Sequence, residues 1–159
     1  MSEEKTNVMR MLDQKKTAYT PHWFDPKGSL DGGTAAALLG KDPATVCKTL
    51  VTQGASKKYY VFVIPVLKEL DLKAAAKAVG EKSIEMIKQA QLLPLTGYIH
   101  GGCSPIGMKK LYRTVVDKSC EAFPSIIFSA GKIGAQVEVA PQDLLRLVNG
   151  TSAEIAVEP

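Results

Sequence analysis

The spacing of hydrophobic residues changes between helical and strand periods, and these changes divide the chain into short elements. Apolar positions at helical spacing predict helices at residues 3–16, 34–39, 72–79, 86–93 and 142–148. Apolar and β-branched runs predict strands at residues 18–24, 46–52, 58–66, 97–100, 113–116, 125–128 and 137–140. The strands at 46–52 and 58–66 flank a short polar segment with a glycine, which indicates a hairpin.

Local residues mark where several of these elements begin and end. Asp71 is placed to cap the helix at 72–79, and Gly80 to end it. Asp31 or Ser29 is a candidate N-cap for the helix at 34–39. Pro141 suits the first turn of the last helix, where its missing N–H costs nothing.

The order of these elements predicts the fold class. Strands and helices are mixed without regular βαβ alternation. This order favours the α/β (mixed α+β) class, with a twisted mixed β-sheet that curls toward a barrel and is flanked by helices. The 159 residues suit a single domain that spans residues 1–159. The 45% of hydrophobic residues and 23% of charged residues are typical of a soluble globular protein.

Composition also bears on where the protein acts and on its partners. The first residues include acids and no apolar stretch, so they do not form a secretory signal. The three cysteines contain no CxxC pair, which fits reduced thiols, and we expect a cytoplasmic location. No apolar run approaches the roughly 20 residues that span a bilayer. The net charge of +4 permits a partner that carries phosphate but does not require one.

Several common kinds of site are absent from the sequence. His22 and His100 lack a metal-ligand spacing with the cysteines. The chain has no GxSxG motif, although a Ser-His-Asp arrangement stays open, and no GxGxxG motif. The segment Ser129–Ile133 is similar to the end of a phosphate loop, but Ile126 and Ile133 occupy positions that require glycine and Ser or Thr. We therefore expect neither a metal nor a nucleotide cofactor.

Lys48 stands out because it interrupts an apolar strand, with Val46, Leu50 and Val51 around it. Lysine is rarely buried without a partner. Two interpretations remain open. Lys48 either guards an edge strand against aggregation or lies at the floor of a cleft, where its cation faces an anion.

Two glycine-containing segments add a second signal. Gly101 and Gly102 follow a predicted strand, and the segment 129–134 contains two further glycines. Such residues either form tight turns or leave the backbone open for N–H groups to converge on an oxygen. The second arrangement stabilises the tetrahedral intermediate of an ester without an acid or a metal.

Five segments, taken in order, resemble the YbaK/EbsC family of aminoacyl-tRNA deacylases. They are PATVCKTLV, LDLKAAAKAVG, TGYIHGGCSPIGMKK, SIIFSAGKIG and APQDLLRLV. The pattern TGY-x-x-GG-x-SP-x-G-x-KK, from Thr96 to Lys110, is the most specific part. Members of this family are freestanding relatives of the editing domain of bacterial prolyl-tRNA synthetases. The resemblance covers nearly the whole chain and implies removal of a wrong amino acid from tRNA, above all cysteine from proline tRNA.

The resemblance also implies roles for individual residues. Lys48 matches the key lysine of the family's cleft, and Gly101 and Gly102 match glycines that contact the aminoacyl ester. For cysteinyl substrates the family lets the thiol of the substrate attack its own ester, so the enzyme needs no nucleophile. Around these residues, the positions expected to bind substrate are Thr49, Cys103, Ser104, Pro105, Ser129, Gly131, His22 and Asp31.

The sequence departs from the family at three of these positions. Cys103 replaces a residue that is usually aliphatic, and His22 and Asp31 stand where the best-known cysteine editors have aromatic residues. The wall that senses the amino acid therefore differs. Cysteine is the first expectation, and alanine or another small residue is the alternative.

Cys103 invites interpretation as a nucleophile, but this requires a lowered pKa and a base within reach. Only His100 is near in sequence, and on one extended strand residues three apart point to opposite faces. We therefore expect Cys103 to pack the loop. Strand alternation also predicts that Cys47 points away from the face that carries Lys48. We expect His22 to be a hydrogen-bonded histidine and not a catalytic base.

Lys109 and Lys110 follow the glycine loop and are the lysines expected to contact the phosphates of the acceptor stem. The expected partners are an aminoacyl-tRNA and, in a ternary complex, prolyl-tRNA synthetase; we expect no membrane and no DNA partner. A binding module without turnover is the rival interpretation. A redox enzyme built on Cys103 would need a resolving cysteine that the spacing does not offer.

Overall fold

The computed structural model describes residues 4–25 and 32–159. Its helices are α1 (Asn7–Gln14), α2 (Gly32–Leu39), α3 (Leu72–Val79), α4 (Leu92–Thr96) and α5 (Pro141–Val148), with short 3-10 helices η1 (Pro43–Thr45), η2 (Gln89–Gln91) and η3 (Lys118–Ala122). Its strands are β1 (Thr20–Trp23), β2 (Cys47–Gly54), β3 (Tyr59–Pro65), β4 (Glu69–Leu70), β5 (Ile84–Met86), β6 (Arg113–Asp117), β7 (Ile126–Lys132), β8 (Ala135–Val139), β9 (Thr151–Ala153) and β10 (Ala156–Val157).

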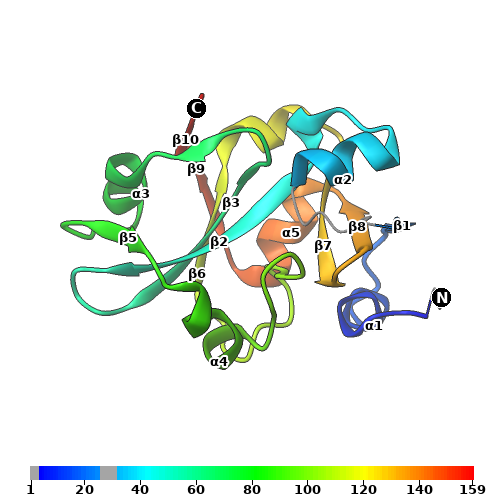
Figure 1. Ribbon diagram of the computed structural model, residues 1–159, viewed down its shortest axis with the longest axis horizontal. Helices are drawn as coiled ribbons and strands as arrows, with labels where there is room; N and C mark the ends of the chain where they lie inside the picture. Colours follow the sequence, from blue (N-terminus) through cyan, green and yellow to red (C-terminus); the bar gives the residue numbers. More distant parts are fainter. Residues whose placement is uncertain (1–3, 26–31) are drawn as a thin grey trace.

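The main strands form two sheets that meet at one point. The larger sheet has the order β5-β2-β3-β6-β9 and the smaller has the order β1-β8-β7, while β4 and β10 pair separately. Both parallel and antiparallel pairs occur in the larger sheet, as a mixed sheet requires. A parallel bridge between Val46 and Ile127 joins the start of β2 to β7. The predicted α/β (mixed α+β) class is confirmed, and the sheets curl without closing into a barrel (Figure 1).

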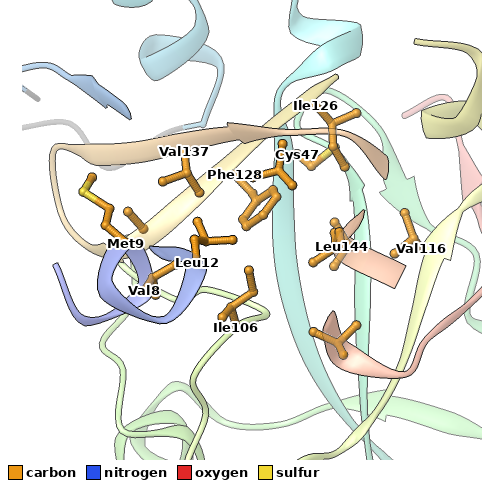
Figure 2. Packing of buried hydrophobic residues seen from close by; sticks show 14 of the residues in the cluster. Val8, Met9, Leu12, Cys47, Ile106, Val116, Ile126, Phe128, Val137 and Leu144 are labelled. Carbon is orange, nitrogen blue, oxygen red and sulfur yellow. The ribbon is translucent and has the colours of Figure 1, made fainter. Parts of the chain in front are cut away.

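The larger sheet is covered on both faces because its central strands are apolar on both. One face presents Phe62 and Ile64 to α3, which lies at the left of the molecule in Figure 1. The other face packs toward α1, α5 and the smaller sheet. Figure 2 shows Phe128 of β7 in this second core, with Leu12 of α1 and Leu144 of α5 nearby. The loop that carries the predicted glycine site is anchored in the same core through Ile106, which is 4% exposed.

The helix signals that rest on capping are confirmed. The Asp71 side chain accepts hydrogen bonds from the N–H groups of Lys73 and Ala74, and Gly80 ends α3 with a φ of 74°. Pro141 is the first residue of α5, as predicted. The N-caps proposed at Asp31 and Ser29 lie outside the described residues. Within the described residues, no helix is long and apolar enough to cross a membrane.

Two predicted elements are wrong in place or kind, and one predicted helix end is misplaced. Residues 97–100 form no strand. Gly97, with a φ of 87°, ends α4 there, and its N–H donates to Leu93 O at 2.8 Å. The expected helix at 86–93 is instead the end of β5, then η2 and the start of α4. Pro94 does not end a helix but lies in the first turn of α4, where proline is tolerated.

The first helix is shorter than predicted because its cap lies later in the chain. The Thr6 side chain accepts a hydrogen bond from the Met9 N–H at 3.3 Å, so α1 begins at Asn7 instead of residue 3. Residues 4–6 precede the helix. Elsewhere the predicted strand ends shift by a few residues: β7 continues to Lys132, and β8 begins at Ala135.

Candidate active site

Lys48 lies at the start of β2, beside the point where the two sheets meet. It pairs with Ile64 of β3 and follows the bridged Val46 by two residues. β3 pairs with β2 along most of its length, and the other edge of β2 is met by β7 at Val46 and by β5 at Thr52–Gly54. Lys48 thus does not lie on a long open edge, which argues against the aggregation-guard interpretation. Among the described residues, no carboxylate lies within 4 Å of the Lys48 ammonium. The half-buried lysine is therefore available to a negatively charged ligand.

The prediction for Cys47 is confirmed. Cys47 is 4% exposed, and its Sγ lies 3.6 Å from Cys120 Sγ in the core. The hydrogen bond with Cys120, together with burial, raises the pKa of the Cys47 thiol. By strand alternation, the Lys48 side chain points to the opposite face of β2.

Ser129, Gln136 and His22 form a row across the smaller sheet. Ser129 of β7 is paired with Gln136 of β8, which is paired in turn with His22 of β1. Paired residues of neighbouring strands share a face of the sheet. Phe128 and Val137, the neighbouring pair on β7 and β8, are buried on the other face of the sheet, in the core. We call these three residues the polar row.

The polar row leads toward Lys48. Val46 and Ile127 are bridge partners on parallel strands, and Lys48 and Ser129 each follow their bridged residue by two positions. Two steps along a strand return a side chain to the same face. Lys48 and Ser129 therefore leave the bridge in the same direction and on the same side, at the end of the polar row.

Glu138 fixes the orientation of His22. His22 Nε2 lies 2.8 Å from Glu138 Oε1, and the Ser125 hydroxyl donates to the other carboxylate oxygen. The hydrogen bond from Ser125 lowers the pKa of the Glu138 carboxyl, His22 and Lys41 add to this effect, and partial burial opposes it. Glu138 is thus an anion at neutral pH. His22 is hydrogen-bonded, as predicted.

The glycine loop is a turn in which Gly101 and Gly102 serve different purposes. The Gly102 N–H donates to Ile99 O at 3.0 Å, and Gly101 has a φ of 88° at the turn position where glycine is favoured. Gly102 is buried against the end of the β7–β8 hairpin. A Cβ on Gly102 would lie 3.2 Å from the backbone N of Ile133. The two predicted glycine segments are thus in direct backbone contact.

The segment after Ser129 is shaped by a bulge. The pairing of β7 with β8 shifts between Ser129 and Lys132, and Gly131 in between has a φ of 92°. The Gly131 N–H donates to Ser129 Oγ at 3.1 Å. A Cβ on Gly131 would lie 2.9 Å from Cε1 of Tyr98, so this glycine allows the hairpin to approach the glycine loop.

Other predicted substrate positions serve the loop itself. Ser104 is fully buried, and its Oγ accepts a hydrogen bond from the Ile106 N–H at 3.2 Å. Pro105 is also buried. Thr49 lies on the opposite face of β2 from Lys48, and its Oγ1 is buried with no hydrogen-bond partner among the described residues. These three side chains are not brought together with the polar row, and Asp31 lies outside the described residues.

Cys103 is not poised as a nucleophile. Burial raises the pKa of its thiol to about 12, so the thiolate is scarce at neutral pH. The argument from opposite strand faces does not apply, because residues 97–103 form a loop. The conclusion that Cys103 packs the loop is instead supported by its burial.

We expect Cys103→Ala to keep most of the deacylase activity that the resemblance implies, because a thiol with a raised pKa is a poor nucleophile. Cys103→Leu, which adds volume at the same place, should change which amino acid is released. Deacylation rates over several aminoacyl-tRNAs measure both effects. A loss of several orders of magnitude in Cys103→Ala would restore the nucleophile interpretation.

Lys109 and Lys110, the two predicted phosphate contacts, line different cavities although they are adjacent in sequence. Lys109 lines a cavity of about 300 Å³ together with Tyr98 and Gly131, and its Nζ donates to Pro94 O at 3.4 Å. Lys110 lines a second cavity of about 190 Å³, which it shares with Lys15. Both lysines are exposed. Among the residues that the structure describes, no three His, Cys, Asp or Glu side chains gather as a metal site would require.

Sequence reasoning missed Gln136. Its Oε1 is buried and has no hydrogen-bond partner among the described residues, although it stands in the middle of the polar row. The alternation of Ala135, Val137 and Val139 with Gln136 and Glu138 was the available signal. The strand was predicted to begin at residue 137, which left Gln136 outside it.

Comparison with known proteins identifies relatives of this chain. Residues 32–147 match the family described as the aminoacyl-tRNA editing domain. A protein of Enterococcus faecalis, named provisionally as the Cys-tRNA(Pro)/Cys-tRNA(Cys) deacylase EbsC, is 44% identical over 158 residues, which is 99% of this chain and 96% of that protein.

Two solved structures share the fold. The crystal structure of hypothetical protein APE2540 has a TM-score of 0.87 at 22% identity and covers 96% of this chain and 100% of its own. A structure described provisionally as a trans-editing enzyme for prolyl-tRNA synthetase has a TM-score of 0.80 at 20% identity, covering 97% of this chain and 99% of its own. By its match over most of the sequence, this chain belongs to the family of aminoacyl-tRNA editing domains.

Proposed function

We propose that this protein cleaves the ester of a mischarged aminoacyl-tRNA in trans, with cysteine on tRNA(Pro) as the first substrate. Residues 1–159 act as one editing domain, and the protein works in the cytoplasm. The 44% identity to a protein named as a Cys-tRNA(Pro)/Cys-tRNA(Cys) deacylase supports this substrate. Two observations carry the proposal: Lys48 and Ser129 lie on one side of the junction of the two sheets, and the glycine loop contacts the β7–β8 hairpin that holds Ser129.

In this mechanism the protein positions the ester and stabilises charge. Lys48 faces the ester carbonyl oxygen and stabilises its developing negative charge. The exposed Gly101 presents bare backbone to the aminoacyl group. Because the Gly102 N–H already donates to Ile99 O, Gly102 contributes through its missing side chain, which lets the two loops close around the substrate.

The substrate supplies the nucleophile. The cysteinyl thiolate attacks the carbonyl carbon, so a C–S bond forms as the C–O bond to the ribose breaks, and the ribose oxygen takes a proton from water. Free tRNA and a thiolactone of cysteine result, and water then opens the thiolactone. The raised pKa of Cys103 supports this division of labour, since the thiolate of this loop residue is scarce and does not compete. Alanine or another small residue, which has no thiol, would need water as the nucleophile and is the alternative substrate.

A panel of aminoacylated tRNAs tests the proposal. The protein is incubated with cysteinyl-, alanyl-, seryl- and prolyl-tRNA, with and without prolyl-tRNA synthetase, and the released amino acid is measured. We expect release of cysteine in preference to proline. If no amino acid is released at micromolar enzyme, the chain is a tRNA- or synthetase-binding module instead.

Affinity for tRNA, measured without a synthetase, should be weak and should fall steeply with salt. A small charge of +4 leaves a few lysines, among them Lys109 and Lys110, to contact phosphates. About three such contacts give a slope near −2 on a double-logarithmic plot, or roughly a twentyfold loss between 50 and 200 mM salt. Filter binding over this range measures the slope. Tight binding that salt leaves unchanged would contradict phosphate contacts and would favour recognition by shape.

A further inference from the structure

The buried Oε1 of Gln136 is an acceptor without a donor. Buried polar groups in folded proteins are nearly always hydrogen-bonded, and an exception calls for a ligand or for a role in function. Among the described residues, the buried side-chain oxygens in this condition are those of Gln136 and Thr49. Only Gln136 stands in the polar row, between Ser129 and His22.

The charged groups around the polar row differ in sign from one part of the site to another. At one end lies Lys48, a cation with no carboxylate nearby in the described part of the chain. Glu138 lies two residues along β8 from Gln136 on the same face, paired with the bridged Ile127. It is bonded to His22 and Ser125, and the Lys41 ammonium lies 3.8 Å from it. An aminoacyl ester has a matching direction, because its carbonyl oxygen gathers negative charge during cleavage and its α-amino group is a hydrogen donor and a base.

We infer that Gln136 Oε1 accepts a hydrogen bond from the α-amino group of the aminoacyl ester and so positions the ester for cleavage. This inference rests on the proposed function. The ester end then faces Lys48 and the glycine loop. The amino end faces Gln136, away from the Lys48 cation that would repel it, and Glu138 favours positive charge nearby. Neighbouring strands are about 4.8 Å apart, so the two spacings from β2 across β7 to β8, about 10 Å, are short enough for one aminoacyl group and two long side chains to bridge.

One consequence concerns substrate choice. An α-amino group that carries an acyl substituent has fewer N–H donors and more bulk where Gln136 lies. The site should therefore spare peptidyl-tRNA and other N-acylated tRNAs, even when the residue attached to the ribose is a cysteine. Gln136 is in this sense a specificity-determining residue as well as a positioning one.

Binding of two non-cleavable analogues tests the inference without turnover. The first is 3′-cysteinylamino-adenosine, and the second is 3′-(3-mercaptopropionyl)amino-adenosine, which lacks only the α-amino group. We expect the wild-type protein to bind the first at least tenfold more tightly in calorimetry. Gln136→Met, which keeps the length of the side chain and removes its acceptor, should reduce this preference to about onefold, whereas Gln136→Glu, which keeps an acceptor oxygen, should retain it.

Gln142 of α5 is exposed, so Gln142→Met is the matched control and should bind both analogues like the wild type. Thermal melts establish that each variant is folded. If Gln136→Met is not folded, the preference between the two analogues is compared in Gln136→Glu instead. A preference for the amino group that survives in Gln136→Met would overturn the inference. The proposed function stands or falls separately, on release of cysteine from cysteinyl-tRNA by the wild-type protein.

Discussion

Lys48→Ala should lower the rate of cysteinyl-tRNA deacylation by about a hundredfold or more, the typical loss when a preorganised electrostatic group is removed. The reason is positional. Lys48 sits at the junction of the two sheets with no described carboxylate nearby, on the same side as Ser129. Stability should change little or rise, because a half-buried charge is costly to the fold. Single-turnover deacylation by the folded variant, checked by thermal melts, measures both effects.

Lys48→Arg extends this test. The guanidinium is wider than an ammonium and holds its donors in a fixed plane, so it should not fit a site shaped for a compact cation. We expect its rate to stay far below that of the wild type although the charge is kept. Lys118→Ala is a suitable control, since this lysine is exposed in η3 and is not part of the polar row. Near-wild-type rates for Lys48→Ala would sink the proposed mechanism.

Gly102→Val should reduce the deacylation rate by roughly a hundredfold, because small displacements of positioning groups have effects of this size. A Cβ at this position would already lie 3.2 Å from the Ile133 backbone N, and the branched side chain adds two further carbons. The backbone cannot yield as a flexible side chain would, so the glycine loop must move away from the β7–β8 hairpin. The fold should lose about 1–3 kcal/mol, as is usual for overpacking. Activity and urea unfolding are measured on the same preparation.

Gly80→Ala is the control for this variant: it replaces a glycine without disturbing the contact between the glycine loop and the β7–β8 hairpin. Gly80 has a φ of 74°, but a Cβ there would meet nothing within 4 Å. This variant should be destabilised by backbone strain, about 1 kcal/mol, with an unchanged rate. If Gly102→Val were as active as Gly80→Ala, the contact between the two loops would have no part in catalysis.

The elements that could be predicted are those whose signals are local. Helix α3 was bounded correctly because Asp71 and Gly80 act on their own neighbours. The hairpin of β2 and β3 was found because both strands are apolar and a glycine-containing turn links them. The segment 97–100 was misread as a strand because Tyr98 and Ile99 favour extended structure. Turns at Gly97 and Gly101 on either side redirect the backbone instead.

Some candidate residues could be predicted from the sequence, but their arrangement could not. Lys48 is conspicuous because a charge in an apolar strand is costly. Gly101 and Gly102 are conspicuous because two adjacent glycines are costly to order. The polar row could not be foreseen, since His22, Gln136 and Ser129 meet only through the register of three strands. Register depends on how whole strands pair, and single positions carry little information about it.

The pairing of β1 with β8 also governs when the protein becomes complete during its own synthesis. Thr20 pairs with Glu138, so the first strand leaves the ribosome long before its neighbour exists. At a synthesis rate of about 5–20 residues per second, the wait is roughly 6–24 s. For most of that interval Lys48 has no Ser129 beside it, and His22 has no Glu138 to bind. The growing chain therefore meets a tRNA-rich environment before its own site can form, and editing has to wait until β8 has been made and has paired with β1.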